Sequence, residues 1–126
     1  PNTHLVMHGA SSVPQELLAI INAHGGQIPD TYGVPLDEIT RAIRYGIRKI
    51  NVDTDLRLAS TGAIRQFMQE FPAEFDPRKY LGKAQQAMET VCIKRYEAFG
   101  TIGHADKIKP IPLEQMAINY QQLQMA

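Results

Sequence analysis

The chain has 126 residues, of which 44% are hydrophobic and 21% are charged, and this composition is typical of one ordinary globular domain or of a part of one. Lys and Arg together number 13, as do Asp and Glu, which argues against a broad basic surface that would bind nucleic acid or an anionic membrane. The first residues lack the basic-then-apolar order of a signal peptide, and no apolar run approaches the roughly 18 residues of a membrane span, so we expect a cytoplasmic protein.

The first 35 residues predict a strand, a helix and a loop. The segment from Leu5 to Met7 is too short and too apolar for a surface strand, so we expect a strand buried in a parallel sheet. Pro14 can open the helix that follows, and the Gly25-Gly26 pair ends it. Residues 25–35 hold three Gly and two Pro, which predicts an irregular loop.

The middle of the chain predicts a helix, a second strand and a longer helix. Residues 35–46 carry apolar side chains on one helical face, with Pro at the start and Gly at the end. Residues 47–52 have the β-branched content of a strand. The longer helix begins near Leu56 and lasts until Pro72, and Asp53 or Thr54 can cap it.

Two more helices are expected in the last third. The first covers about 77–99 with Asp76 as its cap, and the second covers 113–123. The side chains expected to face inward from the first are Leu81, Ala84, Met88, Val91, Cys92 and Tyr96. Because Cys92 is the one cysteine, an internal disulfide is excluded, and we interpret it as a buried, inert thiol.

This order of elements indicates an α/β fold with parallel strands. Two strands cannot make such a sheet, and a (β/α) barrel needs about 200 residues or more. We therefore expect residues 1–126 to be the C-terminal part of a single TIM-barrel domain, with the last two β/α units followed by extra helices. The N-terminal two thirds of the barrel would then lie outside this chain.

Polar side chains follow both predicted strands, in HGASS (8–12) and NVDTD (51–55). If the strands are parallel neighbours, both motifs lie at the edge of the sheet where such folds place their chemistry. Gly9 would let a ligand approach the backbone, Ser11 and Thr54 add hydroxyls, and the helix N-terminus beyond Asp53 favours an anion. A phosphate on a small metabolite is the natural ligand, although the same residues also serve as ordinary turn and cap residues.

His8 ends the first strand and has several possible roles. A strand-end imidazole can ligate a metal, act as a general base or bond a backbone carbonyl. A catalytic zinc needs about three protein ligands. His4 precedes His8 by four residues on an extended segment and would lie roughly 13 Å away, so the two cannot share one ion. This chain therefore supplies one ligand at most by this route.

Lys49 and Arg78 are the remaining candidates. A lysine on a barrel strand can form a Schiff base, but either Lys49 or the neighbouring Arg48 must face the surrounding helices. Asp76 and Pro77 are explained by a helix start, which leaves Arg78 available to pair with a phosphate or a carboxylate.

Three motifs in this order resemble the class II, metal-dependent fructose-bisphosphate aldolases. The motifs are LVMHGASSVP at 5–14, INVDTDLRLASTGAIR at 50–65 and FDPRKYL at 75–81. The resemblance extends through nearly the whole chain and covers the C-terminal third of such an enzyme, in the subgroup whose bacterial members often serve the Calvin cycle. It implies a zinc-dependent (β/α)₈ barrel that reversibly cleaves fructose 1,6-bisphosphate to dihydroxyacetone phosphate and glyceraldehyde 3-phosphate.

The resemblance also implies roles for individual residues. By position, His8 matches the metal-ligating histidine, and Asn51 matches the residue that touches the dihydroxyacetone moiety. The positions that match the two phosphate loops are Gly9, Ser11, Asp53 and Thr54. Arg78 matches the arginine that reaches into a neighbouring subunit's site, which implies at least a dimer. Lys49 is then no Schiff-base former.

The cofactor that the resemblance implies is Zn²⁺, and a monovalent cation is a further candidate. The family's other two metal histidines, its acid/base aspartate and its lid glutamate belong to the missing N-terminal segment, so this segment alone is expected to be inactive. Two alternatives remain: a tagatose-bisphosphate aldolase, which the same motifs would serve, and a non-catalytic phosphate-binding or assembly fragment that docks on a partner chain.

Overall fold

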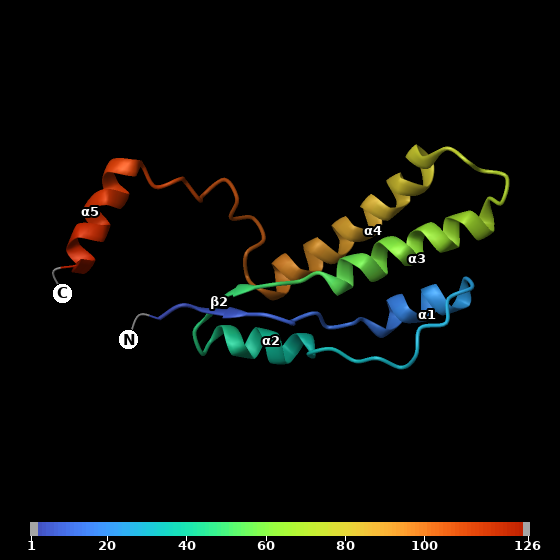
Figure 1. Cartoon of the computed structure of the whole chain (residues 1–126), viewed down its shortest axis with the longest axis horizontal. Coiled ribbons are helices and arrows are strands. Elements are labelled where there is room, and N and C mark those ends of the chain that lie inside the picture. The colour runs from blue at the N-terminus through green and yellow to red at the C-terminus, as the bar shows by residue number, and fades with distance from the viewer. Residues whose placement is uncertain (1–2, 125–126) are drawn as a thin grey trace.

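The computed structural model describes residues 3–124, which contain two strands and five helices (Figure 1). The strands are β1 (Leu5–Met7) and β2 (Ile47–Ile50). The helices are α1 (Gln15–Ala23), α2 (Leu36–Ile43), α3 (Thr54–Glu70), α4 (Pro77–Ala98) and α5 (Leu113–Gln124). The predicted α/β order is confirmed, with ends that differ by a few residues. The second strand ends at Ile50, and α3 begins before Leu56.

β1 and β2 pair in parallel, which confirms the predicted neighbours. Met7 lies opposite Ile50, so both strands end at the same edge of the sheet. The prediction that β1 is buried is wrong for the described part of the chain, because Leu5 and Val6 are each 47% exposed. Strands of three and four residues make a sheet too narrow for the neighbouring helices to cover both of its faces.

The helices build the body of the molecule beyond this edge. α3 and α4 form an antiparallel pair, and α1 lies along the other side of α3 (Figure 1). The core residues between α1 and α3 are Val13, Leu18, Ile21 and Leu58, with Leu17 and Ile28 packed against them. This core therefore supports the loops that follow both strands.

The inward face of α4 is narrower than the sequence predicted. Ala84 and Val91 are buried, as expected, and Cys92 is half-buried. Leu81 and Tyr96 are 52% and 53% exposed, so their predicted inward orientation is wrong. The physical reason is that α3 is the main neighbour of α4, and one neighbouring helix covers only a narrow stripe.

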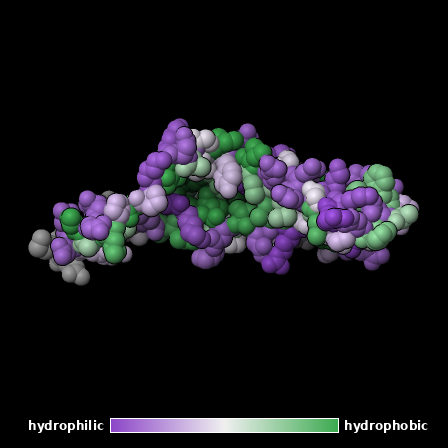
Figure 2. Space-filling model, turned by 90° about the horizontal axis from the view of Figure 1, so that it is seen from above, coloured by the Kyte–Doolittle hydropathy of each residue, from purple (hydrophilic) through white to green (hydrophobic). Residues whose placement is uncertain are grey.

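α5 stands apart from the body at the end of an irregular segment (Figure 1). Seen from above, apolar side chains are exposed in a hollow at the middle of the molecule (Figure 2). Ile50, Val52 and Phe99 are among the residues that line a depression between β2 and the C-terminal end of α4. Within residues 3–124, no helix combines the length and the apolar character that a membrane crossing requires.

Candidate functional site

His8 and Asn51 meet where the two strands end. The Asn51 backbone N–H donates to the Met7 carbonyl at 3.0 Å and so extends the strand pairing by one residue beyond β2. The Asn51 side-chain amide then reaches His8, with Nδ2 2.8 Å from the imidazole Nδ1. Lys49 Nζ donates to Asn51 Oδ1. Because an ammonium can only donate, Lys49 fixes which end of the Asn51 amide faces His8.

The contact with Asn51 engages one nitrogen of the His8 ring. Because the Asn51 amide nitrogen can only donate, Nδ1 is the acceptor in this contact. The side chain is exposed at the end of β1. A histidine binds a divalent metal through a ring nitrogen that carries no proton, so a metal at Nδ1 would take the place of the Asn51 amide. Residues 3–124 contain no group of three His, Cys, Asp or Glu side chains that could hold a metal ion.

Ser11 joins the loop after β1 to the start of α3. Its Oγ accepts hydrogen bonds from the backbone N–H groups of Thr54, at 3.1 Å, and Asp53, at 3.4 Å. The sequence predicted that Asp53 or Thr54 caps this helix; Asp53 is the cap residue, but its side chain accepts no hydrogen bond from the helix backbone. Its carboxylate pairs with Arg57 at 2.9 Å. A hydroxyl from the other loop satisfies the helix N-terminus instead.

Gly9 has a φ of +63°, a left-handed conformation that glycine adopts without strain. No atom lies within 4 Å of the position that a Cβ would occupy, so the space in front of Gly9 is open. The structure therefore brings together His8, Gly9, Ser11, Asn51, Asp53 and Thr54, as their places at the ends of neighbouring strands predicted.

Arg78 lies elsewhere. It is one residue inside α4, with a side chain that is 88% exposed, and its guanidinium forms a two-point contact with Asp76 at 3.0 and 2.6 Å. Asp76 also caps α4 by accepting from the Arg78 backbone N–H, which confirms the predicted helix start. The hydrogen bond from Arg78 lowers the pKa of Asp76 below its ordinary value. The C-terminal end of α4 contacts the loop after β1 through Arg95. Arg78 lies at the opposite end of this helix, which rises about 1.5 Å per residue, and is therefore remote from the loops that contain His8 and Asn51.

An ion pair that the sequence analysis missed lies directly behind the two loops. The Asp55 carboxylate, which is fully buried, accepts from Val13 N at 2.9 Å, Ser12 N at 3.2 Å and Ser12 Oγ at 3.1 Å. Arg95, near the end of α4, donates from Nη2 to Asp55 Oδ2 at 2.8 Å and to Ser12 Oγ at 2.6 Å. The loop after β1, the start of α3 and the end of α4 are thus joined at one carboxylate.

The pKa of Asp55 results from two opposed effects. Burial raises the pKa, but the hydrogen bonds from Arg95, Val13 and Ser12 together lower it below the ordinary value. Asp55 is therefore ionised at neutral pH. A sequence signal for this pair did exist, because Arg95 falls on the same helical stripe as Ala84 and Val91, where an apolar residue is expected.

Comparison with known proteins identifies the family of this chain. Two parallel strands that end in polar loops, each followed by a helix, define a piece of an α/β domain. Residues 2–104 match the family model described as fructose-bisphosphate aldolase class-II, and the chain belongs to that family. It is 66% identical over 120 residues to the fructose-bisphosphate aldolases of Pseudomonas aeruginosa and Stutzerimonas stutzeri. It is 58% identical to the "Fructose-bisphosphate aldolase 2" of Cereibacter sphaeroides.

The coverage of these matches is unequal. Each alignment takes in 95% of this chain but only 34% of the relative. The chain thus spans about a third of the length of the curated relatives that it matches.

Proposed function

We propose that the complete protein containing this chain reversibly cleaves fructose 1,6-bisphosphate to dihydroxyacetone phosphate and glyceraldehyde 3-phosphate. The observation that carries this proposal is the meeting of His8 and Asn51 at the ends of adjacent parallel strands, in a chain of this family. The loops beside them suit the phosphates of the substrate, because Gly9 is open and the α3 N-terminus is adjacent.

The proposal includes a (β/α)₈ barrel, in which β1 and β2 are neighbouring strands. Further strands on either side would cover Leu5 and Val6, whose exposure is unusual for apolar residues of a parallel sheet. The site would then lie at the C-terminal ends of the barrel strands, as in other enzymes of this architecture. We further propose a cytoplasmic location, in keeping with the balanced charge of the chain.

His8 would hold the divalent metal, for which we propose Zn²⁺, together with ligands from outside this chain. The ion would act as a Lewis acid toward the ketone oxygen of the open-chain sugar while the bond between C3 and C4 breaks. Asn51, whose amide is oriented by Lys49, would donate to the dihydroxyacetone half of the substrate. Lys49 would serve as a donor to Asn51 and form no Schiff base.

The two phosphate loops would bind one end of the substrate. Gly9 and Ser11 contribute from the loop after β1, and Asp53 and Thr54 contribute from the loop after β2. The Ser11 hydroxyl now accepts from the Asp53 and Thr54 backbone N–H groups. An incoming phosphate would compete with Ser11 for these donors, and the Ser11 hydroxyl could then donate to the anion.

The test is a cleavage assay on the complete purified protein, with and without a chelator. We expect cleavage of fructose 1,6-bisphosphate that the chelator abolishes and that added Zn²⁺ restores, since the metal supplies the Lewis acid. Faster cleavage of tagatose 1,6-bisphosphate would assign the other sugar. Absence of cleavage with either sugar, in a protein of full length by mass spectrometry, would favour a non-catalytic phosphate-binding protein.

Arg78 is expected to serve the site of a neighbouring subunit. In the complete protein, Arg78→Ala should lower kcat/KM for fructose 1,6-bisphosphate by about 10- to 100-fold, the loss of one charge-assisted contact to phosphate. Arg41→Ala is the matched control, because Arg41 is also an exposed arginine paired with a carboxylate on its own helix. Steady-state kinetics of the two variants measure the difference.

Subunit mixing tests whether Arg78 acts across an interface. If it does, mixed oligomers of His8→Ala and Arg78→Ala subunits contain some sites with both native side chains. Activity should then rise above that of either variant alone when the two proteins are dissociated and reassembled together. An unchanged, low rate after mixing, with subunit exchange verified by native mass spectrometry, would place the action of Arg78 within its own subunit.

A further inference from the structure

We propose that Arg95 is a positioning residue for the phosphate loop after β1, residues 8–14. This inference rests on the phosphate-binding role that the proposed function gives to that loop. Arg95 comes from α4, far along the chain, and touches the loop at the Ser12 hydroxyl. It acts on the phosphate site through Ser12 and Asp55, without a contact to the substrate.

The contacts of Arg95 fix the loop at adjacent points. Its Nη2 donates to Ser12 Oγ at 2.6 Å and to Asp55 Oδ2 at 2.8 Å. Asp55 in turn accepts from the backbone N–H groups of Ser12 and Val13. Val13 has a φ of +50°, which is strained for a β-branched side chain and persists only where neighbouring groups hold it. The shape of the loop therefore depends on the carboxylate that Arg95 orients.

The loop's phosphate-binding side is one residue away. Ser11 precedes Ser12, and its hydroxyl lies on the Thr54 N–H at 3.1 Å. Asp55 follows Thr54 directly. The two loops are therefore joined by two neighbouring hydrogen bonds, one between Thr54 and Ser11 and one between Asp55 and Val13. A displacement of Ser12 would move Ser11 and open the junction at which a phosphate is expected to bind.

The environment of Arg95 favours positioning over simple packing. The side chain is 10% exposed and lies on the buried stripe of α4, one turn after Val91. Its Nε is buried without a hydrogen-bond partner in residues 3–124. An apolar residue would fill this place without leaving a buried donor unpaired, and buried ion pairs are weak sources of stability. A requirement on the geometry of the loop accounts for the arginine.

The experiment compares Arg95→Met with its parent in the complete protein. The KM for fructose 1,6-bisphosphate and the inhibition constant of inorganic phosphate should both rise about tenfold, as expected when one charge-assisted bond to phosphate is lost. The kcat should change less than KM, since the groups near the reacting carbon remain. Arg95→Lys keeps a cation beside Asp55 and should recover part of the affinity.

Val91→Ala is the matched control, because it removes buried apolar atoms from the same face of α4 and Val91 has no side-chain group that could hydrogen-bond the loop. It should lower Tm and leave KM and the phosphate inhibition constant within about twofold of the parent. The inference is overturned if Arg95→Met leaves both constants unchanged, or if Val91→Ala raises them equally. Should Arg95→Met not fold, Ser12→Ala removes the hydroxyl that Arg95 contacts and is judged by the same constants.

Phosphate binding and cleavage by the parent protein distinguish a failure of the proposed function from a failure of this inference. A parent that binds inorganic phosphate by calorimetry but cleaves neither sugar bisphosphate contradicts the aldolase activity alone. Weaker phosphate binding by Arg95→Met would still support the positioning role in that case. A parent that neither binds phosphate nor cleaves overturns both proposals.

Discussion

His8→Ala is expected to abolish both metal binding and cleavage in the complete protein. His8 is exposed at the end of β1 and contacts Asn51 at the edge of the sheet where the metal is proposed to bind, so its imidazole lies within reach of the ion. Loss of a residue that merely supports a metal ligand typically costs 10- to 100-fold, so loss of a ligand should lower kcat/KM by more than about 100-fold. Elemental analysis of the purified variant and steady-state kinetics measure the two losses.

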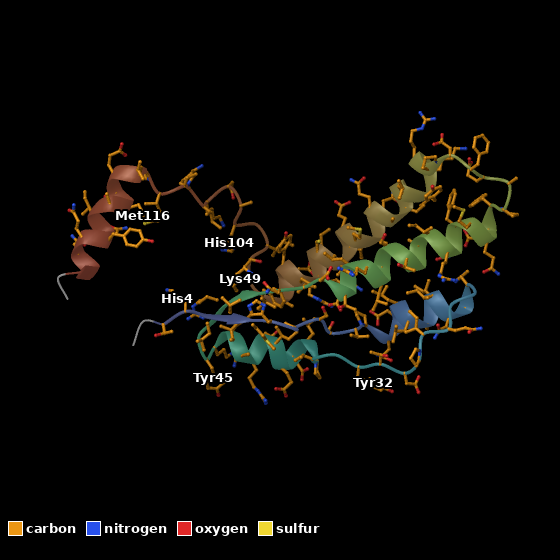
Figure 3. All side chains as sticks on the ribbon, viewed as in Figure 1. His4, Tyr32, Tyr45, Lys49, His104 and Met116 are labelled. Atoms are coloured by element: carbon orange, nitrogen blue, oxygen red, sulfur yellow. The ribbon has the colours of Figure 1, made fainter. Side chains whose placement is uncertain are left out.

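His4→Ala is the control for this substitution. His4 is exposed at the start of β1, away from the loops at the other end of the strand (Figure 3). His24 and His104 are engaged locally, with Nδ1 2.7 Å from the Ile20 carbonyl and 2.8 Å from the Ile102 carbonyl, respectively. We expect His4→Ala to retain metal and rate. Full metal content and full activity in His8→Ala would contradict the site assignment.

Local sequence signals predicted most of the fold. Proline and glycine residues predicted the helix ends, as at Pro14 and Pro35, because they restrict or release the backbone dihedral angles at their own positions. The Asp76 cap of α4 is equally local. The parallel pairing of β1 with β2 followed from the order of elements, and with it the meeting of His8 with Asn51.

The remaining features depend on contacts between distant segments. Ser11, from the first loop, provides the hydrogen bonds that the sequence assigned to Asp53 or Thr54, and nothing near Ser11 in the chain indicates this. The pair of Asp55 with Arg95 joins residues 40 positions apart. The predicted burial of Leu81 and Tyr96 is wrong because helical periodicity gives the direction of an apolar face but not how much of that face a neighbouring helix covers.

Asp55→Ala is expected to give the largest loss of stability of any substitution in the site. It removes the acceptor of Val13 N and Ser12 N and leaves the Arg95 guanidinium buried without its counter-ion. Breaking a buried ion pair in this way costs about 3–5 kcal/mol of the free energy of unfolding. Asp53→Ala, two residues away, breaks the exposed pair with Arg57 and should cost no more than about 1 kcal/mol. Urea unfolding of both variants gives the comparison.

The pH dependence of unfolding provides a second test of Asp55. Its pKa in the folded state is lowered from the ordinary value of 3.8, although burial alone would raise it, because Arg95 and the Val13 and Ser12 backbone groups donate to the ionised form. The unfolded chain therefore takes up this proton at higher pH than the folded one does. The contribution of Asp55 to stability is present above its ordinary pKa and is lost as the pH falls through the folded-state value.

The parent protein should thus lose stability from about pH 4 downward more steeply than Asp55→Ala does. Asp53→Ala should follow the parent, since it leaves the Asp55 carboxylate and its donors in place. Urea unfolding at a series of pH values between about 2 and 6 measures the slopes. Equal slopes for the parent and Asp55→Ala would mean that Asp55 takes up its proton at the same pH in both states. The donors around the carboxylate would then only balance the cost of its burial.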